Sequence, residues 1–280
     1  MPDHSATVAS RTRPTRAAGR AFLFAVPIAT LGGLIGLGGA EFRLPVLVGP
    51  LGYPAWRAVP LNLAVSIVTI AASLAIRSRS LSFAAVTPLL PVILALIAGA
   101  VVAAVAGTAL IHRISDERLE RIILVLLVVI GCALIVEGFL PGDGPGLLPG
   151  GAGWRIGAGV VFGLGIGLVS SLLGVAGGEV IIPTLIFAYR ADVKTAGTAS
   201  LLVSLPTVAV GILRYARRGA YDRQAMSDTV APMGAGSVIG AVIGGLLVGL
   251  VPAPVLKVGL GIILNVSAVR IFHATRRAAA

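Results

Sequence analysis

The chain has 280 residues, of which 57% are hydrophobic and only 12% are charged, and its mean hydropathy is +1.01. A soluble protein carries about 25% charged residues, so the composition excludes an ordinary soluble domain and indicates an all-α polytopic membrane protein. The excess of 22 Lys and Arg over 11 Asp and Glu does not indicate nucleic-acid binding, because the basic residues stand at the ends of apolar runs rather than along one helical face.

About eight segments are apolar over the roughly 20 residues that a membrane-spanning helix needs. Residues 1–18 are expected to form a disordered basic cytoplasmic tail. It resembles the start of a signal peptide, but the apolar run that follows holds one copy of an internal repeat. The spans are expected near 20–50, 58–76, 84–110, 120–140, 155–190, 197–213, 229–250 and 255–273, with the first and fifth broken at glycines.

An internal duplication divides the apolar region. "GLGGAEFRLP" at 36–45 and "GVAGGEVIIP" at 174–183 share their glycines, a glutamate and a proline in one register, and "PLNLAVS" at 60–66 corresponds to "TASLLVS" at 198–204. We therefore predict two repeats of four helices, each opening with a glycine-broken helix. The first repeat covers 19–140 and the second 154–275, and the Pro- and Gly-rich segment 141–153 links them.

Basic stretches predict the orientation in the membrane. If each broken segment crosses once, "RSRS" at 77–80 and "RYARRG" at 214–219 lie on the same side as both termini. The positive-inside rule then places these loops and both termini in the cytoplasm, and the two halves run parallel. If a short segment is a re-entrant hairpin instead, the halves are inverted.

The glycine motifs predict a substrate site. Irregular backbone survives at membrane depth only where it is buried in protein or lines a cavity, and the exposed N-terminus of a half-helix attracts anions. Two other glycine series, Gly159, Gly163 and Gly167 and Gly236, Gly240 and Gly244, are expected only to pack helices together. The candidate substrate-binding residues are Gly36, Gly38, Gly39, Glu41, Pro45, Asn62, Ser66, Gly174, Gly177, Gly178, Glu179, Pro183, Ser200 and Ser204.

The two glutamates need a separate explanation, because an ionised carboxylate beside a half-helix N-terminus competes with an anionic substrate. Burial disfavours the ionised form, so Glu41 and Glu179 are expected to carry a proton during transport. Arg43 offers Glu41 a neutralising partner, whereas Val180 and Ile181 offer none to Glu179. Glu179 is therefore the preferred proton carrier, and capping of the half-helix is its alternative role.

The paired "GxGGxxxxxP" motifs, the duplication and the polar patches resemble the sulfite exporter TauE/SafE family. The resemblance covers nearly the whole chain from about residue 20 and implies a multi-pass permease of the inner (plasma) membrane. It implies a small sulfur-containing or related organic anion as substrate, commonly sulfite or a sulfonate, usually moved outward. Ala40 and Ala176 stand where the family often has glycine, and Glu41 and Glu179 occupy positions that are often apolar.

Two other function classes were weighed against an anion transporter. An intramembrane enzyme needs a nucleophile and a base, but Ser170 and Ser171 have no histidine at span depth to activate them. A non-transporting membrane scaffold has no need for polar groups at matched depths in both halves. The expected partners are a small anion and the lipid bilayer, with no cofactor, metal or nucleic acid; the oligomeric state is left open.

Overall fold

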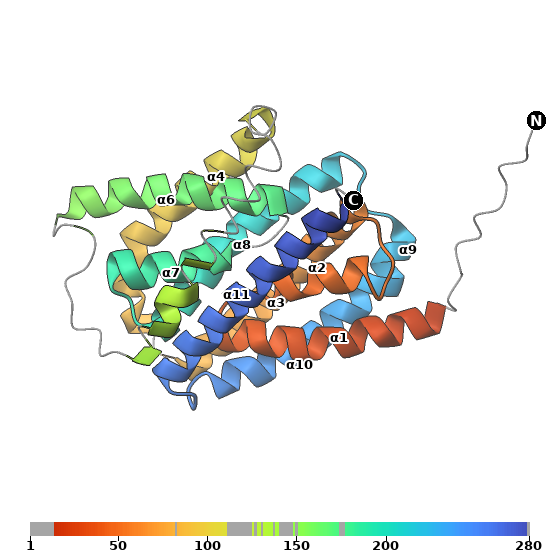
Figure 1. Ribbon diagram of the computed structural model, residues 1–280, viewed down its shortest axis with the longest axis horizontal. Coiled ribbons are helices and arrows are strands. Elements are labelled where there is room, and N and C mark those ends of the chain that lie inside the picture. Colours follow the sequence, from red (N-terminus) through yellow and green to blue (C-terminus); the bar gives the residue numbers. More distant parts are fainter. Residues whose placement is uncertain are drawn as a thin grey trace, which may run out of the picture.

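The computed structural model describes residues 14–81, 83–110, 125, 128–129, 131–136, 138–139, 148, 151–173 and 177–278, so the expected tail and linker fall largely outside it. All elements in the described residues are helical (Figure 1). In chain order they are α1 (Pro14–Ile35), α2 (Ala40–Val48), α3 (Ala55–Ser80), the 3-10 turns η1 (Phe83–Ala85) and η2 (Thr87–Leu89), α4 (Leu90–Leu110), α6 (Ala152–Leu173), α7 (Gly178–Tyr189), α8 (Val193–Arg217), α9 (Arg223–Ala225), the π-helical turn η4 (Met226–Val230), α10 (Ala231–Leu247) and α11 (Ala253–Ala278).

Five helices are long and apolar enough to cross a membrane: Ala18–Ile35, Trp56–Arg79, Thr87–Val105, Val193–Arg217 and Arg223–Leu247. Shorter apolar helices cover Ala152–Leu168, Gly178–Tyr189 and Ala253–Val266. The class of helical membrane protein is thus shown. The full set of eight spans remains a prediction, and most of the span expected near 120–140 lies outside the described residues.

Two stripes of small residues hold the helices at close range. The series Gly236, Gly240 and Gly244 brings α10 against the backbone of α1, and the series Gly159, Gly163 and Gly167 brings α6 against α4. A Cβ at Gly240 or Gly163 would overlap a backbone carbonyl of the facing helix. The prediction that these glycines form packing surfaces is therefore confirmed.

Each broken helix turns back on itself. Beyond the first break, Arg20 Nη2 near the start of α1 donates to Pro50 O just after α2, over 2.9 Å. Beyond the second break, Tyr189 Oη at the end of α7 donates to Arg155 O near the start of α6, over 2.8 Å. The pairs α1/α2 and α6/α7 are therefore helical hairpins whose glycine breaks form the tips.

The directions of α3 and α8 overturn the prediction of parallel halves. Leu63 lies against Gly211, and Arg77 Nη1 donates to Thr198 Oγ1 over 2.9 Å, so the two helices run antiparallel. Residues 77–80 and 214–219 consequently lie at opposite ends of the helices. The parallel interpretation is wrong because each break reverses the chain instead of continuing the crossing, which was the alternative of a re-entrant hairpin.

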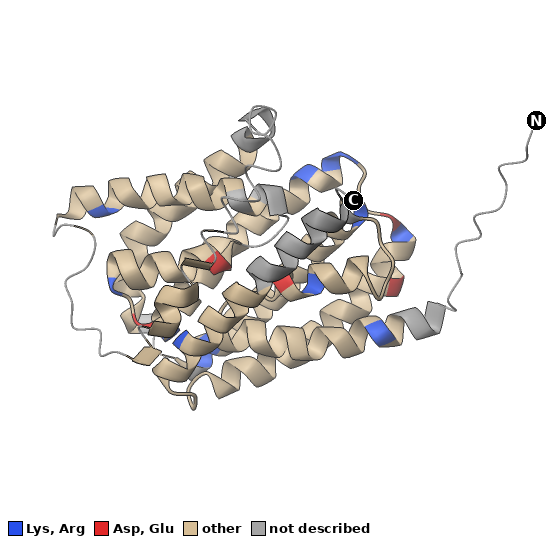
Figure 2. Cartoon of the chain, viewed as in Figure 1, with Lys and Arg blue, Asp and Glu red and all other residues tan. Residues whose placement is uncertain are grey.

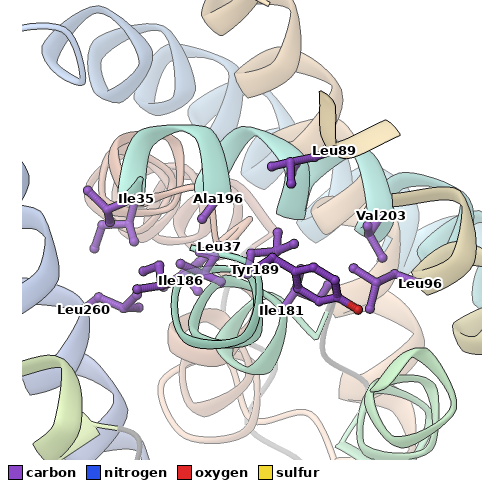
Figure 3. Close-up of a cluster of buried hydrophobic side chains, with 14 of the residues drawn as sticks. Ile35, Leu37, Leu89, Leu96, Ile181, Ile186, Tyr189, Ala196, Val203 and Leu260 are labelled. Carbon is purple, nitrogen blue, oxygen red and sulfur yellow. The ribbon is translucent and has the colours of Figure 1, made fainter. Parts of the chain in front are cut away.

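A buried apolar cluster surrounds α7 and joins both halves (Figure 3). Ile181 and Ile186 of α7 pack in it with Leu37 from the first glycine break, Leu96 of α4 and Val203 of α8. The charged residues gather mainly toward the two ends of the bundle, with few between them (Figure 2). The few buried charges inside the bundle therefore mark the place to look for a site.

Candidate functional site

Glycines form both breaks, as predicted. Gly36, Gly38 and Gly39 have φ angles of 96°, 81° and 74°, and Gly177 has a φ angle of 79°, a region that residues with a Cβ rarely adopt. A Cβ at Gly36 would also overlap the backbone of Gly197 on α8. The breaks therefore require glycine for conformation and, at Gly36, for close approach. Gly174 lies outside the described residues.

The two half-helices begin side by side. Gly39 and Gly177 are the N-cap residues of α2 and α7, and neither end has a side-chain cap. A Cβ at Gly178 would lie 3.2 Å from Leu37 Cα, so the start of α7 touches the break that precedes α2. Two helix N-termini with glycine at the N-cap therefore meet inside the bundle, and their dipoles favour a negative charge there.

The prolines of the motifs do not make the breaks. Pro45 and Pro183 both lie inside their half-helices, which continue past them. Pro45 is exposed on the outer face of α2, whereas Pro183 is buried. Of the two, only Pro183 lies in the interior near the breaks.

Arg43 fills the polar patch of the first half. The side chain is fully buried, and Nη1 donates to Ser66 Oγ over 2.9 Å and to Asn62 Oδ1 over 3.4 Å, while Nη2 donates to Thr69 Oγ1 over 2.9 Å and to Gly38 O over 3.2 Å. Asn62 Nδ2 also donates to Ala40 O over 3.0 Å. Asn62 and Ser66 thus help to hold α2 against α3, and their contact with a substrate stays a prediction.

The polar patch of the second half has no such cation. The residue that corresponds to Arg43 is Ile181, which packs in the apolar cluster. Ser200, Ser204 and Thr207 on α8 are buried at the positions that correspond to Asn62, Ser66 and Thr69. Ser200 Oγ has no hydrogen-bond partner among the described residues.

Both glutamates are buried in the first turn of their half-helix, as predicted. The charge of Glu41 acts on both Arg43 and Glu179, so the two carboxylates lie within electrostatic reach of each other. Arg43 bonds to α3 rather than forming an ion pair with Glu41, and neither oxygen of Glu41 has a hydrogen-bond partner in the described part of the chain. Arg43 therefore acts on Glu41 through its charge without an ion pair, and neutralisation of Glu41 by Arg43 stays a prediction.

Asn62 and Ser66 were predicted from the sequence, but the continuation of a polar stripe along α3 through Thr69, Ser73 and Arg77 was missed. Asn62, Ser66, Thr69, Ser73 and Arg77 are all fully buried. Their spacing of three or four residues puts them on one face of the helix. That spacing was the available signal, and Thr69 also matches Thr207 in the second half.

Arg77 belongs to the bundle interior rather than to a loop. Its Nε donates to Gly33 O over 3.0 Å and its Nη2 to Leu34 O over 2.8 Å, at the end of α1. Nη1 donates to Thr198 Oγ1 over 2.9 Å and to Lys194 O over 3.2 Å, at the start of α8. The predicted basic loop at 77–80 therefore contributes one of its arginines to a buried contact, since the carbonyls at a helix C-terminus favour a cation.

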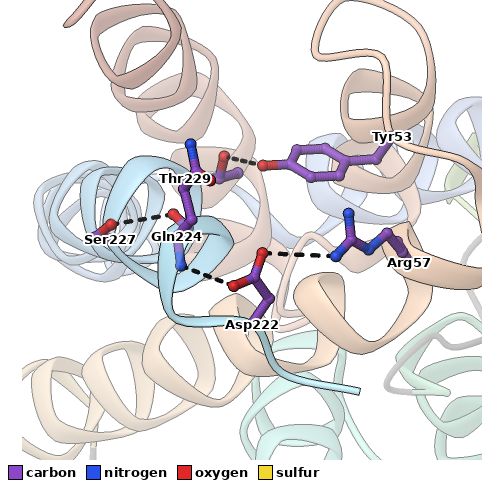
Figure 4. Close-up of polar contacts among 6 residues, drawn as sticks. All are labelled: Tyr53, Arg57, Asp222, Gln224, Ser227 and Thr229. Carbon is purple, nitrogen blue, oxygen red and sulfur yellow. Dashed lines mark hydrogen bonds and ion pairs between the residues drawn. The ribbon is translucent and has the colours of Figure 1, made fainter. Parts of the chain in front are cut away.

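Polar contacts join the opposite end of α3 to the second half (Figure 4). Tyr53 Oη and Thr229 Oγ1 lie 2.7 Å apart, and Arg57 Nη2 lies 3.5 Å from Asp222 Oδ2. Tyr221 Oη donates to Pro60 O over 3.3 Å, and burial raises the pKa of Tyr221 to about 12, so that it remains a donor. The ends of α3 are thus tied to different parts of the second half.

The comparison with known families found a match over most of the chain. The family profile described as "Sulfite exporter TauE/SafE" matches residues 3–134 and 159–280, nearly the whole chain. The chain belongs to the TauE/SafE sulfite exporter family. This membership implies a membrane transporter of sulfur-containing anions. Neither the comparison with curated proteins nor that with solved structures returned a match.

The TauE/SafE match does not identify the residues that bind the substrate, so the chemistry of the groups near the glycine breaks indicates what can bind there. Among the described residues, no three His, Cys, Asp or Glu side chains gather so as to hold a metal ion. Near the two glycine breaks lie the starts of α2 and α7, the guanidinium of Arg43, the carboxylates of Glu41 and Glu179, and the hydroxyl of Ser200. Donors and a fixed positive charge suit an oxyanion, and a carboxylate suits a proton.

Proposed function

We propose that this TauE/SafE protein is a secondary transporter that binds a small anion between the N-termini of α2 and α7. The contact between the N-termini of α2 and α7 inside the bundle, both with glycine at the N-cap, is the observation that carries the proposal. Discontinuous helices whose N-termini point at anionic groups are how secondary transporters build substrate sites at the bilayer midplane. Sulfite, a sulfonate or a related organic anion is the substrate class, and export is the direction.

The halves are inferred to be inverted repeats. Support comes from the antiparallel α3 and α8, and from a reciprocal arrangement in which α1 packs on α10 while α6 packs on α4. Glycines with positive φ angles at 39 and 177 open α2 and α7 at the same offset in each half. Inverted repeats around a central site are a common basis of alternating access.

The revised arrangement changes the predicted orientation. The start of α1, the region 214–219 and the end of α11 lie toward one end (Figure 1), and the sequence of the last two holds "RYARRG" and "ATRR". The positive-inside rule assigns this end to the cytoplasm. Residues 77–80 then face the outside of the inner (plasma) membrane.

Proton coupling through Glu179 is the second part of the proposal. Glu179 is buried beside a half-helix N-terminus, and Glu41 lies within electrostatic reach. Two neighbouring carboxylates disfavour double ionisation, so one proton is held between them and can move with the anion. The resulting complex keeps the net charge of the site low while an anion occupies it.

Flux in proteoliposomes tests the proposal. The full-length protein should drive accumulation of labelled sulfite when a pH gradient is imposed. Glu179→Gln keeps shape and hydrogen bonding but removes titration, so it should abolish pH-driven accumulation while leaving exchange at equal pH intact. A Gln variant that still responds to the gradient like the parent would disprove the coupling role, and absence of flux in both proteins would disprove transport of this anion.

A further inference from the structure

Arg77 joins the two halves at one end of the bundle. Its side chain is fully buried, and its hydrogen bonds are shared between two helices that belong to different halves. Nε and Nη2 donate to Gly33 O and Leu34 O in the last turn of α1. Nη1 donates to Lys194 O and Thr198 Oγ1 near the start of α8. The guanidinium therefore links the end of α1, which leads into the first glycine break, to the second half.

The backbone of the first break touches α8 beside this guanidinium. A Cβ at Gly36 would overlap the carbonyl of Gly197, and a Cβ at Gly197 would overlap the carbonyl of Ile35. The same Cβ at Gly197 would lie 3.0 Å from Arg77 Nη1. Arg77 thus lies at the point where the first break, and with it the start of α2, meets the second half.

The two sides of this contact differ in strength. The C-terminus of α1 favours a cation, whereas the N-terminus of α8 disfavours one, because the helix dipoles point in opposite senses at these ends. Thr198 Oγ1 also donates to Lys194 O over 3.0 Å, so the hydroxyl keeps a hydrogen-bond partner when Arg77 moves away. The bonds to α8 are therefore the ones that break first, while Arg77 stays bound to α1.

The opposite end of α3 carries a second contact between the halves. Tyr53 Oη and Thr229 Oγ1 lie 2.7 Å apart, and Arg57 Nη2 lies 3.5 Å from Asp222 Oδ2. The half-helix N-termini lie between this contact and Arg77. Alternating access opens such a central site to one side at a time, so the contacts at the two ends must break in turn.

We propose that Arg77 is a latch between α1 and α8, which releases α8 when the anion site opens toward this end of the bundle. The inference rests on the proposed function, because a transporter must expose its site to each side in turn. Arg77 is then a positioning residue, which controls access to the site without touching the anion. Its bonds to Gly33 O and Leu34 O keep the guanidinium on α1 in both states.

Two buried positions can report the state of the two ends. Thr195 on α8 lies three residues before Thr198, and Ala225 on α9 lies three residues after Asp222; they are only 8% and 7% exposed. A cysteine at either position, in a Cys132→Ser background, should react with a maleimide mainly while its own end is open. Labelling rates of the purified full-length protein in detergent need no anion and do not depend on the orientation in a membrane.

Removal of the latch should change the two labelling rates in opposite directions. Arg77→Gln should speed labelling of the Thr195→Cys protein at least about tenfold, because hydrogen bonds to a charged group are lost. It should slow labelling of the Ala225→Cys protein, because opening one end closes the other. Thr198→Val removes one acceptor on α8 and leaves both bonds to α1, so it should give the same pattern with a smaller change, about threefold.

Two matched variants serve as controls. Arg79→Gln removes an exposed arginine from the same helix, two residues beyond Arg77. Thr207→Val removes a hydroxyl on α8 that bonds to Val203 O within its own helix. Neither change touches the contact between α1 and α8, so both labelling rates should stay as in the parent.

The outcomes separate the latch from a purely structural arginine. Faster labelling at both Thr195→Cys and Ala225→Cys would mean that Arg77 only stabilises the fold, and an unchanged rate at Thr195→Cys would mean that it does not limit opening. Either result overturns the latch. Sulfite flux in proteoliposomes reads the proposed function separately: opposite changes of the two rates support the latch even if the parent moves no sulfite, and parallel changes in a parent that does move sulfite overturn the latch alone.

Discussion

The two halves of the site have the same backbone but different charges. In the first half, Arg43 reaches from α2 onto α3 and donates to Asn62, Ser66 and Thr69. In the second half, Ile181 lies at the corresponding position, and the hydroxyl of Ser200 on α8 faces the start of α7. The polar patch of the first half therefore binds the side chain of Arg43, whereas the polar patch of the second half binds no arginine of its own half-helix.

This difference shows how a duplicated scaffold acquires a directional site. The glycine breaks and hairpins are common to both halves, since they depend on backbone conformation and close helix approach. The fixed positive charge enters from one half only, so an anion at the junction meets an asymmetric surface. A buried arginine that is held by neutral groups retains its attraction for an anion, because no carboxylate is bonded to it.

The relative direction of the halves gives the largest expected effect, since labelling is all or none. Single cysteines at the exposed positions Arg79 and Ala216 are introduced in a Cys132→Ser background. An impermeant maleimide added to intact cells should label the first and spare the second, because α3 and α8 end on opposite sides. If neither cysteine is labelled from the outside, the two halves run parallel and the inverted arrangement is wrong.

Replacing the cation gives the next largest effect. Arg43→Met should weaken anion affinity by about 2 kcal/mol, or roughly thirtyfold, since a hydrogen bond to a charged group contributes about that much. Ile181→Met, the matched change in the second half, conserves volume and should alter affinity by less than about twofold. Calorimetry with sulfite measures both. Similar losses in the two variants would show that the halves do not differ in charge supply.

Alanine in the polar patches separates structural bonds from ligand bonds. Asn62→Ala removes the donor to Ala40 O and an acceptor of Arg43, so the thermal midpoint should fall, by an amount corresponding to about 2 kcal/mol. Ser200→Ala removes a hydroxyl without a partner among the described residues, so stability should hold while anion affinity falls. A stability loss of equal size at Ser200 would mean that both patches are structural.

Local chemistry made much of this molecule predictable from sequence. The glycine breaks follow from helix propensity and positive φ angles, and the offset of 138 residues that relates Gly39 to Gly177 holds in the structure. The glycine stripes were also predictable, because four-residue spacing of small residues serves close helix packing. These features depend on residues near one another in the chain.

Long-range packing accounts for what was missed. Whether a chain continues or reverses after a break depends on contacts such as Gly39 against Ile28, which no local pattern specifies. The sequence "RSRS" predicts that Arg77 lies in a loop. In the structure Arg77 is buried in the bundle, where it donates hydrogen bonds to carbonyls at the end of α1. The hydrogen bonds of Arg43 likewise required knowing that α2 folds back beside α3.

The smallest expected effect concerns two threonines at matched positions. Thr69 accepts from Arg43 Nη2 over 2.9 Å, whereas the bond recorded for Thr207 Oγ1 is to Val203 O within its own helix. Valine keeps the shape of threonine and removes only the hydroxyl. Thr69→Val should therefore cost about 1 kcal/mol of stability, and Thr207→Val less than about 0.5 kcal/mol.

A double-mutant cycle ties that difference to the cation. If Thr69 acts through Arg43, the cost of Thr69→Val should fall to that of Thr207→Val in the Arg43→Met background, because only the bond from Thr69 Oγ1 to Val65 O then remains. The cost of Thr207→Val should be the same in both backgrounds, since Thr207 belongs to the half without a built-in cation. Thermal unfolding of the purified variants in detergent measures all four values. An undiminished Thr69 effect without Arg43 would show that the first patch is held by the packing of α3, and the contrast between the two halves would then lie in helix contacts rather than in charge.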